Sequence, residues 1–232
     1  MSYTSYSDAR MSHSFHSNPR KSLRSPEREL AFRKEQIATT KRSLILKPQG
    51  DARSAMSYKI TDSDDTLEFT VTGRKYGDRS CREFRDSSGL PFFELHTAGL
   101  SIFSSRWYIT LPGGGDVKVA KAGPQVSWNG SVMKFTFQNM AAADTKREED
   151  KELTLSVAKY GVALSFFDIV DNDRRIAEVR ESIQHNDKLN LRRSSRAQGH
   201  RPTLELTVMP GVDASLVAAI AVILSDWYFG SN

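Results

Sequence analysis

Apolar and polar residues alternate in short runs over most of the chain, from about residue 43 to residue 208. In one such run Leu67, Phe69 and Val71 would point one way, and the polar residues between them the other. Successive side chains of a β-strand face opposite sides, so this period of two predicts strands with one buried face. Clusters of Gly, Pro, Asn, Asp and Ser separate the runs and predict tight turns.

The alternating runs predict about twelve short strands. They cover residues 43–47, 67–72, 79–86, 90–96, 100–103, 107–111, 117–122, 132–137, 153–157, 162–170, 174–183 and 203–208. The stretch around Asp62, Asp64 and Asp65 is predicted to be a polar connection. Since no helical pattern lies between the strands, the fold class is mainly β, an antiparallel barrel or sandwich.

The last apolar stretch, residues 214–224, has no polar face, because every residue there except Ser215 is apolar. A helix of this kind must be enclosed by protein or by lipid. Crossing a bilayer takes about 17–25 apolar residues, and Asp226 ends this run too early. We therefore predict a helix enclosed by protein, extending over 214–228, with Leu216, Ile220 and Leu224 in the core.

The segment before this helix predicts how the helix begins. Pro210 and Gly211 break the last strand, and Asp213 is a good N-cap residue. A closed barrel of about twelve strands is too wide for the side chains of its own wall to fill. The apolar helix is the obvious filling, so we predict a closed antiparallel barrel around a central C-terminal helix.

Residues 1–42 form a Ser- and Arg-rich segment whose few apolar residues are scattered. Such a segment buries too little apolar surface to offset the entropy of ordering it, so we predict a disordered basic tail followed by one folded domain, residues 43–232. The start has no apolar stretch typical of a secretory signal peptide. We expect an intracellular protein, cytoplasmic or peripheral to a membrane, and leave a nuclear or mitochondrial location open.

The net charge of +5 is unevenly distributed. Residues 1–55 hold eleven Lys and Arg against five Asp and Glu, so the folded part is close to neutral. The basic pI therefore does not indicate a domain that binds nucleic acid sequence-specifically. The single cysteine, Cys81, rules out an internal disulfide and any cysteine-based zinc finger.

Three stretches carry a family resemblance: VTGRKYGDRSCREFRDSSGLPFFEL at 71–95, RWYITLPGGG at 106–115 and MPGVDASLVAAIAVIL at 209–224. They resemble the LURP-one-related family of the tubby C-terminal-like superfamily, which also includes the phospholipid scramblases. The resemblance covers roughly residues 43–228. It implies a closed barrel of twelve antiparallel strands around a central helix, in agreement with the periodicity.

The resemblance also implies a range of functions. Tubby proteins bind phosphoinositide head groups through basic residues on the barrel surface, and scramblases associate with membranes. Plant LURP-one-related proteins are linked to pathogen defence. Scramblases carry a cluster of palmitoylated cysteines, and the single cysteine here argues against that kind of anchor.

Motifs for catalysis or metal binding find no support. The glycine run 113–115 precedes a strand and lacks the GK[ST] of a P-loop. A calcium loop starting at Asp168 would have Asp173 where glycine is needed and Val179 where glutamate is needed. His96, His185 and His200 have no Cys or His three or four residues away, and no nucleophile motif occurs. We expect no enzyme, no cofactor and no metal.

Two groups of basic residues are candidates for an anionic lipid head group, because cations near an acidic membrane contribute on the order of 1 kcal/mol each. The candidates are Arg74, Lys75, Arg79, Arg82 and Arg85 around one turn, and Arg192, Arg193 and Arg196 in a long loop. The alternative is that these are solvated charged turns.

The leading hypothesis is a non-enzymatic, tubby-like module, expected to be a monomer, that binds an anionic phospholipid or phosphoinositide or docks at a membrane surface. The alternative is a protein-interaction scaffold, related to stress or defence, that is regulated through its N-terminal tail or binds a partner there.

Overall fold

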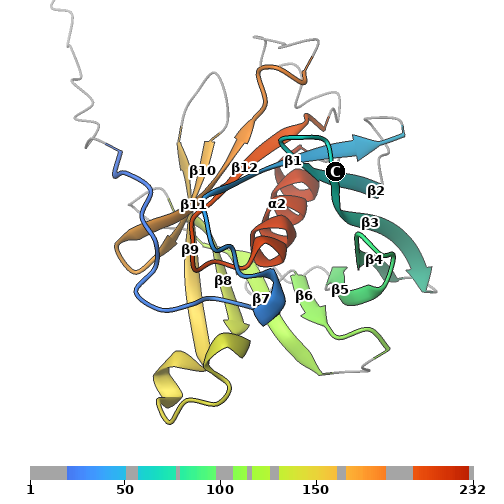
Figure 1. Cartoon of the computed structure of the whole chain (residues 1–232). Helices are drawn as coiled ribbons and strands as arrows, with labels where there is room; N and C mark the ends of the chain where they lie inside the picture. The colour runs from blue at the N-terminus through green and yellow to red at the C-terminus, as the bar shows by residue number, and fades with distance from the viewer. Residues whose placement is uncertain are drawn as a thin grey trace, which may run out of the picture.

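The structure is a computed structural model that describes residues 20–50, 57–76, 79–97, 107–113, 117–125, 131–160, 166–186 and 201–229. Within these residues twelve strands form one closed antiparallel barrel (Figure 1). Each strand pairs with its neighbours in sequence, and β12 closes the ring against β1. The strands are β1 (Arg42–Gln49), β2 (Ser57–Asp62), β3 (Leu67–Tyr76), β4 (Arg79–Asp86), β5 (Pro91–Thr97), β6 (Trp107–Thr110), β7 (Lys118–Pro124), β8 (Ser131–Gln138), β9 (Glu152–Tyr160), β10 (Phe166–Asp171), β11 (Arg174–Glu181) and β12 (Leu204–Val208). The predicted barrel is confirmed.

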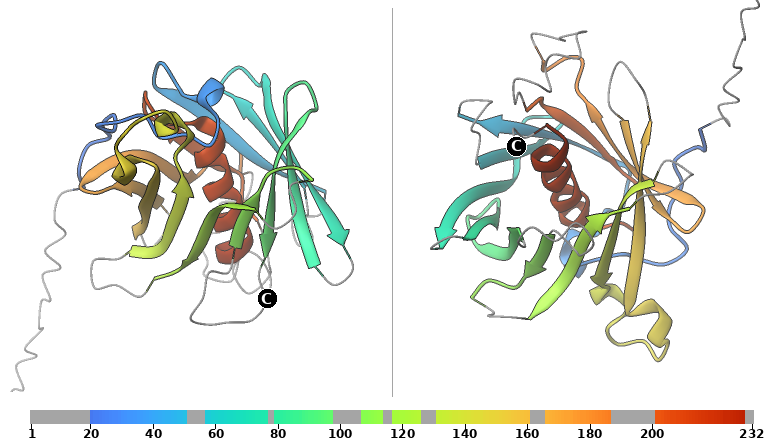
Figure 2. Two further views of the ribbon diagram at one scale, coloured as in Figure 1. Left: turned by 90° about the horizontal axis from the view of Figure 1, so that it is seen from below. Right: turned by 180° about the vertical axis from the view of Figure 1, so that it is seen from behind.

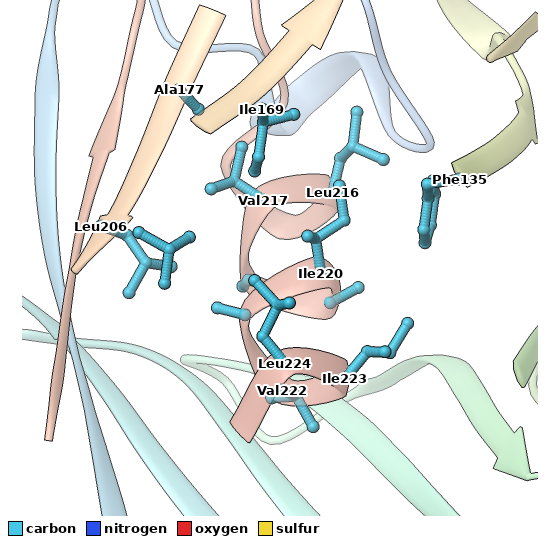
Figure 3. Close-up of a cluster of buried hydrophobic side chains, with 14 of the residues drawn as sticks. Phe135, Ile169, Ala177, Leu206, Leu216, Val217, Ile220, Val222, Ile223 and Leu224 are labelled. Carbon is cyan, nitrogen blue, oxygen red and sulfur yellow. The ribbon is translucent and has the colours of Figure 1, made fainter. Parts of the chain in front are cut away.

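Helix α2 (Ala214–Phe229) runs through the interior of the barrel, enclosed by strands in both views of Figure 2. Leu216, Ile220 and Leu224 are completely buried. Figure 3 shows side chains from successive turns of α2 pointing toward different parts of the wall, among them Leu206 and Phe135. The prediction that protein encloses this helix is therefore confirmed.

Both ends of α2 are fixed by specific contacts. Asp213 caps the first turn, since its Oδ1 accepts hydrogen bonds from the Ser215 and Leu216 amides at 2.7 and 3.3 Å. At the other end Trp227 packs against Trp107, with ring centroids 5.6 Å apart. The predicted N-cap is confirmed.

Strand β2 is not among the strands predicted from sequence. It pairs with β1 and β3 and buries Tyr58 and Ile60. Only these two apolar residues alternate there, among charged neighbours, so the run is too short to stand out. The predicted strand at 100–103 lies outside the described residues.

Residues 20–41 differ from the prediction of a disordered tail. They form a strap along the outside of the barrel that reaches the start of α2, drawn in blue in Figure 1. The strap makes isolated β-bridges from Leu23 to Arg175, from Leu30 to Val212 and from Ile37 to Asp213. Short 3₁₀ helices occur in the strap and in the β8–β9 connection: η1 (Lys34–Gln36), η2 (Met140–Ala142) and η3 (Glu148–Asp150). Residues 1–19 of the predicted tail lie outside the described residues.

The strap is held in place because its scattered apolar residues pack into the hydrophobic core of the barrel. Leu30 and Ala31 are fully buried, and Phe32 is 8% exposed. The Phe32 ring lies 5.8 Å from that of Phe93 and 5.6 Å from that of Phe137. Phe32 thus fills the barrel at the end where α2 begins, a contact that the local sequence gives no sign of.

Gly211 joins the last strand to the helix in a conformation that favours glycine, with a φ of +86°. A Cβ there would lie 3.3 Å from Cγ of Pro26 in the strap. We expect Gly211→Ala to lower the free energy of unfolding by about 2 kcal/mol, measured by urea titration. Gly89→Ala is the matched control, because Gly89 has the same φ of +86° and nothing within 4 Å. If both variants cost the same, the contact with Pro26 contributes nothing.

Candidate functional site

Of the predicted head-group residues, Arg82 and Arg85 lie on opposite faces of β4. Arg82 points inward, where its Nη2 donates to Oδ1 of Asp226 at 2.7 Å and its guanidinium lies over the Tyr58 ring. Arg85 points outward and donates to the Gly89 carbonyl at 2.7 Å. The structure therefore does not bring Arg82 and Arg85 together, because successive residues of a strand face opposite sides and these two are three residues apart.

The structure does not describe the side chains of the other cations that were predicted to bind a head group. The side chains of Arg74, Lys75 and Arg79 lie outside the described part of the chain, as do residues 192–196 with Arg192, Arg193 and Arg196. The strand ends that flank the two groups are nevertheless placed. Because all neighbouring strands are antiparallel, the β3–β4 and β11–β12 strand ends lie at the same end of the barrel. That is the end where α2 finishes, since Asp226 meets Arg82 there.

Three surface clefts formed by described residues differ in charge. The largest of the three, about 510 Å³, is lined by two cations and three carboxylates. The second, about 460 Å³, is mostly apolar and is called the apolar groove; Leu111, Val117 and Met140 on its edge are 44%, 60% and 43% exposed. The third, about 250 Å³, is lined by four cationic residues and one acidic residue. Charge makes the third cleft the best candidate for an anion.

This third cleft, called the basic cleft, lies between the strap and the turn that joins β10 to β11. Its lining consists of Lys21, Ser22, Arg24, Asp173, Arg174 and Arg175. The Arg24 amide donates to the Arg175 carbonyl at 2.8 Å, which fixes the strap against β11. Asn172 completes the turn with a φ of +53°, a conformation that asparagine tolerates. The predicted turn at 171–173 thus becomes one wall of the cleft.

A network of charges around the buried carboxylate of Asp168 anchors the cleft from behind. Arg20 donates from Nε to Oδ2 of Asp168 at 3.0 Å, and Nε of Arg175 lies 2.9 Å from Oδ1 of the same carboxylate. Glu178 lies 3.0 Å from Arg20 and also pairs with Arg175. Two cations and two carboxylates balance, so Arg175 is already neutralised. Nη2 of Arg28 lies 3.6 Å from Oδ1 of Asp171 and adds a further ion pair to this anchor. Burial raises the pKa of Asp171, and the charge of Arg28 opposes that rise.

The other cations of the cleft make exposed contacts: Arg24 donates to Ser22 at 3.4 Å, and Lys21 and Arg174 form exposed ion pairs. Lys21 lies 3.8 Å from Asp173, and both side chains are mostly exposed. Arg174 pairs with Glu27, which is likewise exposed. Exposed ion pairs contribute about 0–1 kcal/mol. Exchanging these carboxylates for a phosphate, which accepts strong charge-assisted hydrogen bonds, would therefore cost little.

A model of the LURP-one-related family matches residues 33–226. The match covers most of the chain. This chain belongs to the LURP-one-related family. Among curated proteins nothing matches significantly. An X-ray structure of a protein from Arabidopsis thaliana is similar, at 17% identity and a TM-score of 0.48, over 83% of this chain and 94% of that one.

The LURP-one-related match begins at residue 33, inside the strap. The basic cleft therefore combines residues from inside and outside the matched range. Arg174 and Arg175 lie within the matched residues, whereas Lys21 and Arg24 precede them. Within the described residues, no helix has the combined length and hydropathy that crossing a membrane requires.

Sequence reasoning missed the cleft for a specific reason. The sequence places Lys21 and Arg24 in a predicted disordered tail, and it predicts only a solvated turn at 171–173. About 150 residues separate Arg24 from Arg175 along the chain, and no local pattern reports such a pairing. The excess of basic residues before residue 55 was the one signal that pointed to the strap.

Proposed function

We propose that this LURP-one-related protein is a non-enzymatic, tubby-like module that binds the head group of an anionic phospholipid, with phosphoinositides as the preferred class. The observation that carries the proposal is the basic cleft, where four cationic residues face one acidic residue. Lys21, Arg24 and Arg174 supply the charge, because Arg175 is neutralised by the network behind it.

The chemistry of the cleft suits a phosphate monoester. Arg offers a planar fork of donors that matches phosphate oxygens, and Lys offers a compact charge. Ser22 adds a hydroxyl to the same wall. A phosphorylated inositol ring would gain several charge-assisted hydrogen bonds, whereas a zwitterionic head group would not.

The proposal is tested by co-sedimentation with vesicles of phosphatidylcholine alone and of phosphatidylcholine with a phosphoinositide. We expect the wild-type protein to sediment only with the second. The double variant K21A/R24A should bind about thirtyfold more weakly, since two cations contribute on the order of 2 kcal/mol. The control K34A/K151A removes two cations that pair with Asp144 and Glu148 elsewhere, and should bind as the wild type does.

Each contrary result has a definite meaning. Equal, negligible sedimentation of the wild type with both vesicles would refute lipid binding. Phosphoinositide binding that survives K21A/R24A would refute the basic cleft and return the site to the residues predicted from sequence. Replacing Arg192, Arg193 and Arg196 together with Ala would then remove binding.

A second candidate function, a protein-interaction scaffold, is favoured by the apolar groove. Leu111, Val117 and Met140 expose apolar surface at its edge, as expected where a peptide segment with apolar anchor residues docks. This function becomes the better one if the vesicle experiment shows no lipid binding. It would place the contact surface on the strap and the strands beside it.

A further inference from the structure

The outer face of strands β4, β5 and β6 carries a group of side chains with the chemistry of a metal site. Cys81, Glu94 and His96 each offer one ligand atom, and these three atoms all lie within 4.8 Å of one another. Glu94 and His96 are two residues apart on β5, and Cys81 is directly opposite His96 on β4. Residues spaced by two share a face, so the backbone aims all three at one point.

We propose that Cys81, Glu94 and His96 form a binding site for a zinc ion. Thiolate, imidazole and carboxylate together are a ligand set typical of zinc, whereas calcium and magnesium prefer oxygen ligands alone. Three protein ligands leave one tetrahedral position for a water molecule. The site lies on the opposite part of the barrel wall from the basic cleft and does not depend on lipid binding.

The separation of the His96 and Glu94 ligand atoms fits tetrahedral zinc. Two ligands bound at about 2.0–2.1 Å and separated by the tetrahedral angle lie about 3.4 Å apart. Nε2 of His96 lies 3.3 Å from Oε2 of Glu94. A thiolate needs a slightly longer separation because the zinc–sulfur bond is about 2.3 Å. Sγ of Cys81 lies within 4.8 Å of the other two ligand atoms, so zinc binding would draw the three atoms closer together.

Neighbouring residues hold the histidine ring in place. Thr110 lies opposite Glu94 on β6, and its Oγ1 is 3.1 Å from Nε2 of His96, a hydrogen bond that zinc on Nε2 would replace. The Tyr108 ring stacks on the imidazole, with centroids 4.9 Å apart and an angle of 9° between the planes. This stacking fixes the plane of the imidazole ring.

Burial and charge also fit a bound dication. Cys81 is 2% exposed, and the Glu94 and His96 side chains are 15% and 17% exposed, so the site is shielded but reachable. A thiolate and a carboxylate neutralise Zn²⁺, which removes the cost of burying either charge alone. The nearby buried Glu83 is already paired with Arg85. No sequence motif indicates this site, because Cys81 meets His96 and Glu94 only through the pairing of β4 with β5.

The test is a titration of the metal-free full-length protein with Co²⁺, which reports its ligands in its absorption spectrum. We expect one equivalent to bind with a thiolate-to-cobalt charge-transfer band and the d–d bands of tetrahedral cobalt, and Zn²⁺ to displace it. C81S should lose the charge-transfer band. C81S and H96A should each weaken zinc binding at least about 100-fold, since the loss of a supporting residue alone costs 10–100-fold.

His185→Ala is the matched control, because His185 is hydrogen-bonded to Ser182, away from the proposed ligands. It should bind metal as the wild type does. Far-UV circular dichroism checks that each variant folds, and the wild-type cobalt spectrum decides the question if a variant does not. Absence of the charge-transfer band at saturating Co²⁺, or equal zinc affinity of the wild type and C81S, would overturn the proposal.

Discussion

Ile220→Asp should leave no soluble, folded protein. Ile220 lies in the middle of α2 and is fully buried. An aspartate there would be surrounded by apolar side chains such as those in Figure 3. An unpaired charge in such a site costs several kcal/mol even after relaxation, and the apolar contacts of Ile220 are lost as well. Domains are stable by only about 5–15 kcal/mol, so we expect insoluble expression and no cooperative thermal transition.

Two controls separate burial of charge from the substitution itself. Ile183→Asp makes the same chemical change at a residue that is 61% exposed, and should leave solubility and melting temperature nearly unchanged. Ile220→Val removes one methylene group and should cost about 0.5–1.5 kcal/mol. A soluble Ile220→Asp variant that melts as the wild type does would contradict the position of α2 inside the barrel.

The barrel and its central helix were predictable because both leave strong local patterns. The period of two at Leu67, Phe69 and Val71 fixes which face of a strand is buried. The absence of a polar face in 214–224 fixes the environment of α2. Asp213 follows a strand break at Pro210, which marks where the helix begins. Each of these signals lies within a few residues.

The strap was not predictable, because its order comes from contacts with distant residues. Leu30 and Phe32 look isolated in a basic segment, yet each enters a space that the barrel leaves open. Local composition measures how much apolar surface a segment carries. It does not measure whether that surface fits the end of the barrel where α2 begins.

The same distinction applies to the candidate site. The sequence grouped Arg82 with Arg85, and only the alternation of β4 and the ion pair with Asp226 assign Arg82 to the inside. The basic cleft depends on Arg24 meeting Arg175 across the fold. Charge in the sequence therefore predicts an anionic ligand, whereas the barrel topology decides which charged side chains lie together.

Asp213 connects the helix and the strap in one buried carboxylate. Its Oδ1 accepts from the amides of Ser215 and Leu216 in the helix. Its Oδ2 accepts from the amides of Phe32 and Arg33 in the strap, at 2.8 and 3.0 Å. Burial raises the pKa of Asp213, and the hydrogen bonds from these groups work against that rise.

Asp213→Ala should lower the free energy of unfolding by about 4 kcal/mol, because it leaves several buried N–H groups without acceptors at about 1–3 kcal/mol each. Urea titration would measure this loss. Ser215→Ala removes a single hydroxyl bonded to the same carboxylate and should cost about 1 kcal/mol. A loss for Asp213→Ala no larger than that of Ser215→Ala would show that the carboxylate does not hold the two elements together.

Asp213→Asn separates the two roles of the carboxylate. Asparagine is a good N-cap, but its NH₂ group would face the Phe32 and Arg33 amides, which need an acceptor. We expect the helix to persist while these two amides lose protection against hydrogen exchange. Because the strap also supplies Lys21 and Arg24, the same variant should weaken binding to phosphoinositide vesicles. Full binding with an unprotected strap would mean that the lipid contact does not need the strap in place.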